Sequence, residues 1–404
     1  MDNIHRFRNN PRAIPLGNRG WDEAQESHLI GLKVRATPDD RVWDQETGHG
    51  FINLCSCGYL GLQSHPAVIE GAIAALRSEG VINTSITRLR IRLAILDQLE
   101  EELSGLYRTR TLTALSASAA HSGVLPLVAS GHLSDGQPRV MVFDKFCHFS
   151  MNHMKPVCAD ETLVLTAPHN DLDFLEDVCR KHPRVAFVAD GVYSMGGRAP
   201  VRELLALQDR YGLFLYFDDS HALAAYGERG EGFVRTLLPE MNPLTVIVAS
   251  LNKAFGATGG VVQMGPGQDE PLLARFGGPL AWSQHLNVPA IGAALGSVSV
   301  HRTPELGERQ RRLQENIALF DELMDTDDRG DGLPIRLIRV GEEERAVEAS
   351  KALMSQGYYS SAVFFPIVER GKAGLRVMIR ADNRPEDLRT FCAAVREATA
   401  GVAV

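Results

Sequence analysis

The feature of the sequence that most constrains the fold is a series of five short apolar runs. Each run has about the length of a β-strand, is rich in branched or aromatic residues, and is separated from the next by a spacer with helical character. The runs are Arg139-Val-Met-Val-Phe143, Thr162-Leu-Val-Leu165, Arg184-Val-Ala-Phe-Val188, Leu213-Phe-Leu-Tyr-Phe217 and Thr245-Val-Ile-Val-Ala249. Runs of this kind are typical of buried, parallel strands. Alternation with helices predicts an α/β fold with a large, mostly parallel, doubly wound sheet.

Polar side chains follow four of these runs directly. They lie in the segments 144–148, 190–197, 218–221 and 250–253. In open α/β sheets, ligands bind at the carboxyl ends of the strands. A single polar strand end would be unremarkable, but four that carry Asp, His, Ser and Lys predict one assembled site.

Lys253 and Asp218 are the most informative residues of this expected site. A lysine amine can hold an aldehyde as a Schiff base, and an aspartate can keep a pyridine nitrogen protonated so that the ring acts as an electron sink. Most lysines at strand ends simply point into solvent. The two residues together, each following an apolar strand, indicate an enzyme that uses pyridoxal 5'-phosphate (PLP).

A phosphate cradle is expected at Ser116-Ala-Ser-Ala-Ala-His121, ahead of an apolar run. Small residues at a helix start let backbone N–H groups approach a phosphate, and the helix dipole favours the anion. Packing would also explain such residues, but the downstream Lys253 favours the phosphate. Ser250 is expected to add a hydroxyl donor.

Two histidines and two arginines have competing interpretations. His148 is either a satisfied core histidine or a ring stacked on the cofactor, and His221 is expected to support Asp218 or reach the ring's 3' oxygen. Arg376 lies in an apolar strand-like run, where burial is costly unless a partner such as a substrate carboxylate is bound. The alternative is a solvated edge-strand arginine. Arg380, four residues on, is expected on the same face of the strand.

Bulk properties favour an ordinary globular protein. Hydrophobic residues make up 44% and charged residues 23%, with a formal net charge of −8. This charge argues against general binding of nucleic acid or anionic membranes. The polar N-terminus and the absence of a long apolar run make the cytoplasm the expected compartment. The spacing Cys55-Ser-Cys57 would suit a metal site or a redox pair. The sequence has no second pair of this kind, so buried thiols are favoured and no metal is expected.

The chain is expected to divide into three parts. Residues 1–50 are predicted to form an N-terminal arm, residues 51–290 a large cofactor-binding domain, and residues 291–404 a smaller α+β domain. Helices are predicted from Pro66 to the stop at Gly80, around Leu96, Leu99 and Leu103, and from Val201. In the last part we expect a helix over 305–321, strands near Leu337 and Leu375, and a helix from Pro385.

The motifs resemble those of the α-oxoamine synthase family, fold-type I PLP enzymes of the aminotransferase class I/II group. The resemblance runs from about residue 40 to 395. It is carried by Tyr59-Leu-Gly-Leu62 with His65-Pro66, Thr87-Arg88, Asp190-Gly-Val-Tyr-Ser-Met195, Asp218-Asp-Ser-His221, Ser250-Leu-Asn-Lys-Ala-Phe-Gly256 and Gly277-Gly-Pro-Leu-Ala-Trp-Ser283. The family condenses an amino acid with an acyl thioester, on CoA or a carrier protein. Carbon dioxide and a thiol are released, leaving an α-amino ketone.

The resemblance also implies roles for individual residues. Lys253 would be the Schiff-base lysine, Asp218 the pyridinium partner and His148 the stacking ring. Arg376 would bind the amino-acid carboxylate, with Arg380, Arg88 and Cys57 also near substrate. The remaining cofactor contacts would come from Ser118, Ala119, Ser194, His221, Ser250 and Ser283. Family members place the segment around Ser283 across a dimer interface, so a homodimer is implied.

Several positions depart from the family pattern and predict a divergent member acting in specialised metabolism. Cys57 replaces an asparagine, Arg380 stands at a threonine-type position, and the usual Ser-Gly-Phe-Ala-Ala-Asn ends here in His121. A Gly-containing turn and a histidine are replaced by Arg90-Ile-Arg92 and Asp97. An aminotransferase, decarboxylase or carbon–carbon lyase on the same scaffold therefore remains an alternative, as does a non-catalytic binding protein.

Overall fold

A seven-stranded sheet forms the centre of one of the two compact units into which the chain divides. The computed structural model describes residues 10–37 and 41–400. Within them, the first unit contains residues 62–194 and 198–307, and the second contains residues 10–61, 195–197 and 308–400. The second unit takes in most of the expected N-terminal arm, and its boundaries at 61 and 307 differ from the expected 50 and 290.

The central sheet has the strand order β4-β10-β9-β8-β7-β5-β6. Its strands are β4 (Thr111–Ala114), β5 (Val140–Asp144), β6 (Val164–Ala167), β7 (Val185–Asp190), β8 (Phe214–Asp218), β9 (Thr245–Ser250) and β10 (Gly260–Met264). Five strands run parallel, and β10 is antiparallel to both of its neighbours, β4 and β9. The mostly parallel sheet predicted from the apolar runs is confirmed, whereas β4 and β10 were missed.

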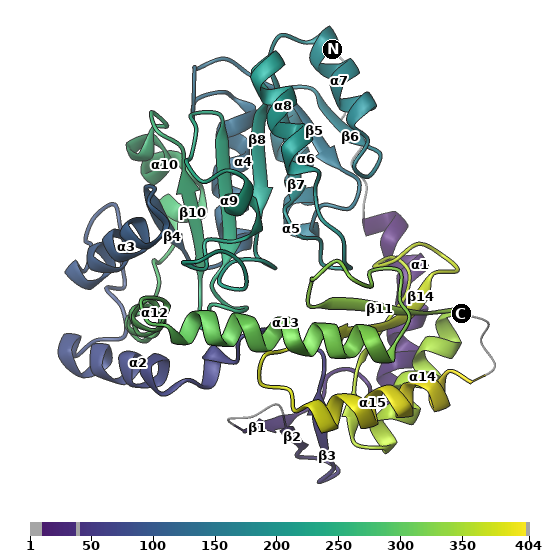
Figure 1. Cartoon of the computed structure of the whole chain (residues 1–404). Coiled ribbons are helices and arrows are strands. Elements are labelled where there is room, and N and C mark those ends of the chain that lie inside the picture. Colours follow the sequence, from purple (N-terminus) through teal and green to yellow (C-terminus); the bar gives the residue numbers. More distant parts are fainter. Residues whose placement is uncertain (1–9, 38–40, 401–404) are drawn as a thin grey trace. The chain divides into compact units, whose positions relative to one another are not determined.

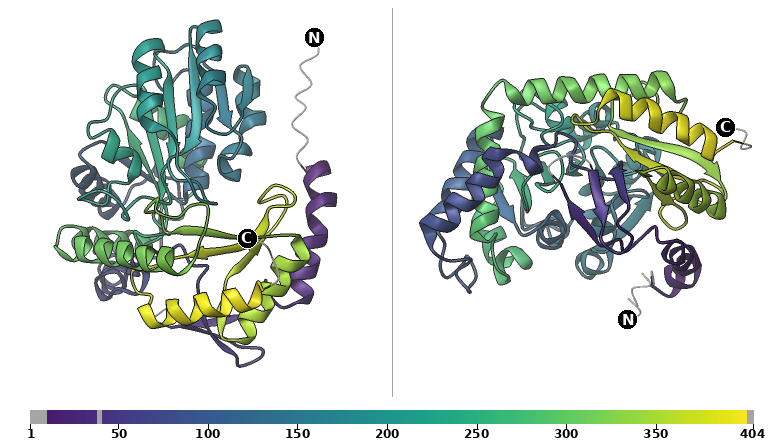
Figure 2. Two further views of the ribbon diagram at one scale, coloured as in Figure 1. Left: turned by 45° about the vertical axis from the view of Figure 1, so that its right-hand side comes forward. Right: turned by 90° about the horizontal axis from the view of Figure 1, so that it is seen from below.

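Helices cover both faces of this sheet (Figures 1 and 2). The helices of the first unit are α2 (Pro66–Glu79), α3 (Ala94–Tyr107), α4 (Ala117–Ala129), α5 (Phe149–Asn152), α6 (Lys155–Glu161), α7 (Leu172–Lys181), α8 (Val201–Tyr211), α9 (Phe233–Leu237), α10 (Glu270–Phe276), α11 (Pro279–Trp282) and α12 (Val288–His301), with a 3-10 turn at Leu62–Ser64.

Alternation along each strand explains why two cores form, one on each face. Phe143 and Tyr216 pack with residues of α4 in one cluster. Their chain neighbours Val142 and Phe217 pack with residues of α7 and α8 in another, because successive side chains of a strand point to opposite faces. Burying an aromatic side chain such as Phe143 contributes about 1.5–3 kcal/mol. These cores hold the strand ends, and therefore the site, in place.

The second unit contains two smaller sheets and four helices among its described residues. Its elements are α1 (Asn10–Glu26), β1 (Val34–Ala36), β2 (Arg41–Asp44), β3 (Gly50–Asn53), most of α13 (Glu305–Leu323), β11 (Ile335–Gly341), α14 (Glu343–Ser355), β12 (Tyr358–Tyr359), β13 (Ser361–Val363), β14 (Ala373–Met378) and α15 (Pro385–Ala398). The sheet orders are β1-β2-β3-β12 and β11-β14-β13.

Strand pairing explains why the N-terminal segment is not a separate arm. Strand β3 pairs with β12, a strand from the C-terminal part of the chain. Ala24 and Leu29 are buried in one cluster with Val347 and Phe364. The polar composition that suggested an arm reflects exposed side chains, while a few apolar residues join residues 10–61 to the C-terminal segment.

Candidate active site

Lys253 lies in the loop that joins β9 to β10. The backbone N–H of Leu251 donates to the carbonyl of Gly259 at 2.9 Å, and that of Gly259 donates to the Asn252 side chain at 2.8 Å. Gly256 has a φ of +77°, and a Cβ there would lie 2.5 Å from the Leu62 carbonyl carbon, so this turn needs glycine. These contacts fix the loop, and Lys253 is half-buried within it.

Asp218 ends the neighbouring strand β8 and is buried. Its Oδ2 accepts a hydrogen bond from His121 Nε2 at 2.9 Å, and its Oδ1 accepts one from the backbone N–H of Ser220 at 2.9 Å. Burial alone would raise the pKa of Asp218. The hydrogen bond from His121, together with the charge of Lys253, outweighs burial and holds this pKa below its ordinary value. Asp218 is therefore a carboxylate at neutral pH.

Asp190 ends β7 directly opposite Asp218 in the strand register. Burial and the negative charge of Asp218 raise the pKa of Asp190 well above its ordinary value, although the backbone N–H of His148 and the charge of Lys253 act in the opposite direction. The pKa values of two adjacent buried carboxyl groups are thus shifted in opposite directions, which favours the charge on Asp218. Such divergence between neighbouring carboxyl groups is typical of functional sites.

His148, Ser194 and His221 occupy the ends of the strands beside this pair. The backbone N–H of His148 donates to Asp190 Oδ2 at 2.8 Å, and the His148 side chain caps α5 and is exposed. His148 is therefore not a core histidine, and its ring is accessible for stacking. Ser194 is half-buried after β7, and His221 is buried in the turn after Asp218.

The expected phosphate cradle is the N-terminus of α4. Ser116 is the N-cap, and its hydroxyl accepts the backbone N–H of Ala119 at 3.1 Å. Ser118 is exposed in the first turn. A Cβ on Gly260 would lie 2.5 Å from the Ala117 nitrogen, so the first residue of β10 must be small for α4 to begin beside it. Ser250, at the end of β9, is half-buried and its hydroxyl accepts the backbone N–H of Asn252 at 3.1 Å.

His121 belongs to the site, although it was predicted only as the end of the phosphate motif. It lies inside α4 and is fully buried, and it joins Asp218 to the hydroxyl of Tyr216, which is 2.8 Å from His121 Nδ1. Tyr216 and Asp218 are two residues apart on β8 and therefore share the face of the sheet that α4 covers. That spacing, with a histidine in an otherwise apolar helix, was the signal available in the sequence.

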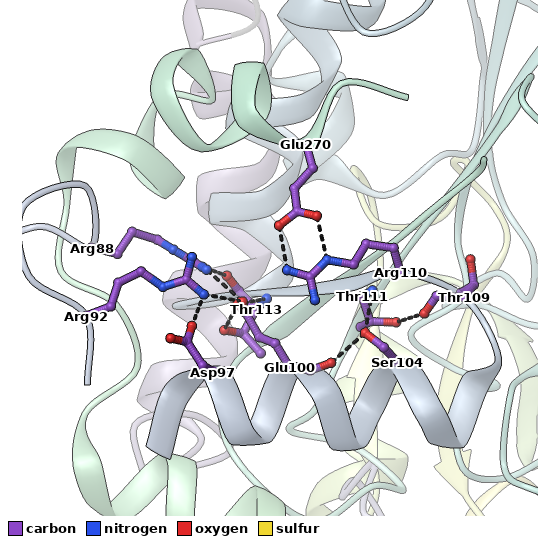
Figure 3. Close-up of polar contacts among 10 residues, drawn as sticks. All are labelled: Arg88, Arg92, Asp97, Glu100, Ser104, Thr109, Arg110, Thr111, Thr113 and Glu270. Carbon is purple, nitrogen blue, oxygen red and sulfur yellow. Dashed lines mark hydrogen bonds and ion pairs between the residues drawn. The ribbon is translucent and has the colours of Figure 1, made fainter. Parts of the chain in front are cut away.

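Arg88 does not fit the substrate role expected of it, because its guanidinium already has buried partners (Figure 3). Arg88 Nη2 lies 2.7 Å from Glu100 Oε2, and Nη1 donates to the carbonyl of Thr113 at 3.1 Å. Glu100 Oε1 accepts both the backbone N–H and the hydroxyl of Thr113 at 2.8 Å. Arg88 and Glu100 therefore join the loop before α3 to strand β4.

Two positions that replace the family's glycine and histidine join this same cluster. Arg92 pairs with Asp97 and also lies 3.2 Å from Glu100 Oε2. Arg110 pairs separately with Glu270 on α10. We refer to Arg88, Arg92, Asp97, Glu100 and Thr113 as the Glu100 cluster. These departures from the family pattern pair with each other and with Glu100, which gives them a structural explanation.

Arg376 and Cys57 belong to the second unit. Arg376 is half-buried on β14, opposite Ser361 of β13. Burial raises the pKa of Cys55 to about 11, while the hydrogen bond from Ser361 and the charge of Arg376 act in the opposite direction. Ser361 donates to Cys55 Sγ at 3.2 Å, which places Cys55 beside the strand pair that carries Arg376. Cys57 is half-buried two residues along.

Arg380 differs from the expectation that it contacts substrate. It is almost fully buried, and its Nε donates to Asp382 Oδ1 at 2.9 Å while Nη2 pairs with Oδ2. A guanidinium that already grips a carboxylate with two nitrogens has a structural partner. Arg380 thus stabilises the segment after β14, and the sequence could not show this because Asp382 looked like an ordinary turn residue.

The remaining predicted contact, Ser283, caps the end of α11, and its hydroxyl donates to the carbonyl of Pro279 at 2.6 Å.

Within residues 10–37 and 41–400, no group of three or more His, Cys, Asp or Glu side chains is arranged to hold a metal ion. Helices in that part of the chain are all too short or too polar to cross a membrane.

Comparison with known sequences gives matches over most of the chain. The family model for aminotransferase class I and II matches residues 49–395. The 8-amino-7-oxononanoate synthase 1 of Bacillus velezensis is 30% identical over 396 residues, which cover 94% of each chain. The 8-amino-7-oxononanoate synthase of Symbiobacterium thermophilum is 29% identical over 350 residues, covering 84% of this chain and 86% of the relative.

Solved structures show the same fold. A structure of SPT with PLP has a TM-score of 0.83 at 20% identity and covers 96% of this chain and 97% of that chain. Serine palmitoyltransferase of Sphingomonas wittichii has a TM-score of 0.82 at 18% identity, covering 95% and 97%. The 8-amino-7-oxononanoate synthase of Francisella tularensis has a TM-score of 0.69 at 19% identity, covering 86% and 97%.

Proposed function

Because this chain belongs to the aminotransferase class I and II family, and within it to the α-oxoamine synthases, we propose that it is a PLP-dependent acyltransferase. The reaction joins the α-carbon of an amino acid to the acyl carbon of a thioester. Carbon dioxide and a free thiol leave, and an α-amino ketone remains. The observation that carries the proposal is the pairing of Lys253 with an ionised Asp218 at the ends of adjacent strands.

The residues present fit PLP. Lys253 supplies an amine, Asp218 is a buried carboxylate with lone pairs left for one more donor, and His148 offers an exposed ring. The N-terminus of α4 offers backbone N–H groups and a favourable dipole to a phosphate. PLP is also present in a structural neighbour of this fold, the fold-type I transferases. When bound, PLP supplies an electron sink for the carbanion formed at the amino-acid α-carbon.

Each residue then has a defined task. Lys253 holds the aldehyde carbon of the cofactor and later moves the proton at the α-carbon. Asp218 keeps the pyridine nitrogen protonated, since a buried carboxylate is stabilised by a positive partner. The exposed ring of His148 would stack on the cofactor ring and would exclude water from it. Ser118, Ala119, Ser250 and Ser283 are proposed to contact the phosphate, and Ser194 and His221 the 3' oxygen.

Arg376 is the residue that we propose binds the carboxylate of the amino-acid substrate. It remains half-buried on β14, and a guanidinium recognises a carboxylate through two parallel hydrogen bonds. Cys57 is proposed to line the same part of the site. Arg88 and Arg380 are not part of the proposed substrate site, because Glu100 and Asp382 already pair with their guanidinium groups.

The test of this function is a thiol-release assay. The PLP-loaded protein is incubated with a panel of amino acids and acyl-CoA or acyl-carrier thioesters, and free thiol and amino ketone are measured. We expect at least one pair to release thiol and carbon dioxide in equal amounts. Conversion of PLP to its amine form with no thiol from any pair would indicate transamination instead and would overturn the proposal.

The role of Arg376 is tested separately with Arg376→Lys. Lysine keeps the charge but loses the paired hydrogen bonds, so KM for the amino acid should rise by roughly 10- to 100-fold, the equivalent of about 1.5–3 kcal/mol for a charged hydrogen bond. Arg389→Lys, at an exposed position of α15, is the matched control and should leave KM unchanged. An unchanged KM in both variants would remove Arg376 from the substrate site.

We further propose that the protein is a homodimer. Phe276 and Trp282, on the adjacent helices α10 and α11, are 63% and 70% exposed. Exposed apolar patches mark sites of protein association, and the resemblance assigns this segment to a dimer interface. A cytoplasmic location stays a prediction from the sequence.

A further inference from the structure

A buried row of hydrogen bonds connects Asp218 to the interior of the first unit. Tyr216, His121 and Asp218 are all buried, and two contacts of 2.8 and 2.9 Å connect them. Tyr216 and Asp218 come from β8, whereas His121 comes from α4. His121 makes both contacts, and it stands at the position where α-oxoamine synthases commonly have asparagine.

The number of hydrogen-bond donors and acceptors shows where the protons lie among Tyr216, His121 and Asp218. Asp218 is ionised, so the 2.9 Å contact needs a hydrogen on His121 Nε2. Burial raises the pKa of Tyr216 well above its ordinary value, so the phenol keeps its proton. If His121 Nδ1 also carried a proton, the Tyr216 O–H would have no acceptor among the described residues. With Nδ1 unprotonated, the phenol donates to it, and the side-chain donors of Tyr216 and His121 both have an acceptor.

The position of Asp190 explains why this arrangement matters. Asp190 and Asp218 are paired in the strand register and both are buried, so their two negative charges would repel each other. Asp190 receives a backbone N–H from His148, whereas Asp218 receives the imidazole N–H and the Ser220 N–H. His121 is the imidazole that distinguishes the two carboxyl groups.

We infer that His121, locked by Tyr216 as the neutral Nε2–H tautomer, is the positioning residue that places the negative charge on Asp218 rather than on Asp190. The inference rests on the proposed function only in taking PLP as the ligand of Asp218. The imidazole orients the carboxylate through Oδ2, and Oδ1 accepts the Ser220 N–H, so each oxygen keeps a lone pair for a further donor. The carboxylate can then accept the protonated pyridine nitrogen.

The first experiment needs no cofactor. Histidine side-chain ¹⁵N NMR of the full chain, with the His121 signal assigned by its loss in His121→Asn, reads the tautomer directly. We expect a neutral Nε2–H ring in the wild type at neutral pH. In Tyr216→Phe, which removes only the hydroxyl, Nδ1 loses its hydrogen-bond donor, so we expect the ring to take up a second proton at a higher pH than in the wild type. A cationic His121 ring in the wild type at neutral pH, or a ring that stays neutral over the same pH range in Tyr216→Phe, would overturn the lock.

The second experiment uses PLP labelled with ¹⁵N in its ring, without substrate. We expect a protonated ring nitrogen in the wild type, a shift toward the unprotonated value in His121→Leu, and recovery in His121→Asn, whose amide can still donate. His132→Leu, at an exposed position in the loop after α4, is the control and should match the wild type. If folded His121→Leu has the ¹⁵N chemical shift of the wild type, the inference is overturned. If His121→Leu does not fold, Tyr216→Phe is measured instead, and a ¹⁵N chemical shift between the protonated and unprotonated values would support the inference.

Kinetics separate positioning from simple loss of stability. Removing a residue that orients a functional group through one hydrogen bond typically costs roughly 10- to 100-fold in activity. We expect kcat to fall by this factor in His121→Leu with KM for the amino acid unchanged. Because both NMR readouts are made without substrate, failure to find any acyl transfer would refute the proposed function and leave this inference testable.

Discussion

Lys253 carries the chemistry proposed for this site, so its replacement is the first test at the scale of single residues. Lys253→Ala should fold with a free energy of unfolding within about 1 kcal/mol of the wild type, because the side chain is only half-buried. It should lose the visible absorbance of covalently held PLP. Borohydride treatment and peptide mapping should label Lys253 in the wild type and in Lys145→Ala, an exposed control. Label on a different lysine would refute the assignment.

His301 predicts a pH dependence of stability. It is buried, its Nδ1 lies 2.9 Å from the carbonyl of Ser297, and burial lowers its pKa from 6.5 to about 4. The unfolded chain therefore binds more protons than the folded protein between about pH 4 and pH 6.5. The stability that His301 contributes is present above pH 6.5 and is lost as the pH falls toward 4, by about 3 kcal/mol in all.

The variant His301→Phe isolates this contribution. The difference in the free energy of unfolding between the wild type and the variant should change by about 3 kcal/mol between pH 7 and pH 4, with the wild type losing more. Urea unfolding at a series of pH values measures it. A difference that does not depend on pH would show that His301 titrates alike in the folded and unfolded states.

The sequence revealed some site residues and hid others for a physical reason. Lys253 and Asp218 were found because each follows an apolar strand, which is a local pattern. The role of His121 was hidden because its partner Asp218 is 97 residues away in the chain. The pairing of Arg380 with Asp382, two residues on, could not be read from an arginine in a strand-like run. The sequence gives the type of each side chain, but it does not show which side chains pair with each other in the fold.

At the scale of elements, the Glu100 cluster joins the loop before α3, the helix itself and strand β4 (Figure 3). Glu100→Gln leaves Arg88 as a buried, uncompensated charge, so it should cost about 3–5 kcal/mol of stability. Glu270→Gln is the matched control, because the Arg110–Glu270 side chains are 38% and 30% exposed, and it should cost at most about 1 kcal/mol.

Urea unfolding of the two variants measures this difference. The midpoint should fall clearly in Glu100→Gln and little in Glu270→Gln, because burial of the ion pair is what separates them. Equal shifts would show that the Glu100 cluster does not hold α3 to β4.

Elements with strong local signals were predicted well. The helix expected from Pro66 to Gly80 is α2, with Gly80 as a left-handed C-cap, and the helix expected from Pro385 is α15. Strands β4 and β10 were missed for a common reason. The two strands pair antiparallel with each other although they lie far apart in the sequence, and β10 also pairs with β9. Tertiary pairing, not local pattern, makes them strands.

At the scale of the whole molecule, the exposed Phe276 and Trp282 lead to a prediction about assembly. Trp282→Glu places a charge on a large apolar side chain that is 70% exposed, so a dimer that buries it should dissociate. Light scattering coupled to size exclusion should give a dimer mass for the wild type and a monomer mass for the variant. Trp43→Glu, at an exposed position of the second unit, is the control. A monomeric wild type would refute the proposed dimer.

The division of the chain was only partly predictable. The large sheet and the smaller C-terminal α+β part follow from local patterns, and the fold class and the family are confirmed. The expected boundary near residue 50 shifted because β3 pairs with β12, more than three hundred residues later in the chain. A polar segment with few apolar residues looks like an arm until its distant partner is known.

The closed loop between β9 and β10 has a consequence for how such an enzyme can diversify. Both ends of the loop are anchored in one antiparallel pair, and hydrogen bonds from Leu251 and Gly259 tie its two sides together. Insertions and deletions here would displace the amine, whereas the segments that carry Cys57 and Arg376 lie on other elements. If those segments contact the substrate as proposed, new substrate preferences can arise by their exchange while the position of the reactive nitrogen is inherited unchanged.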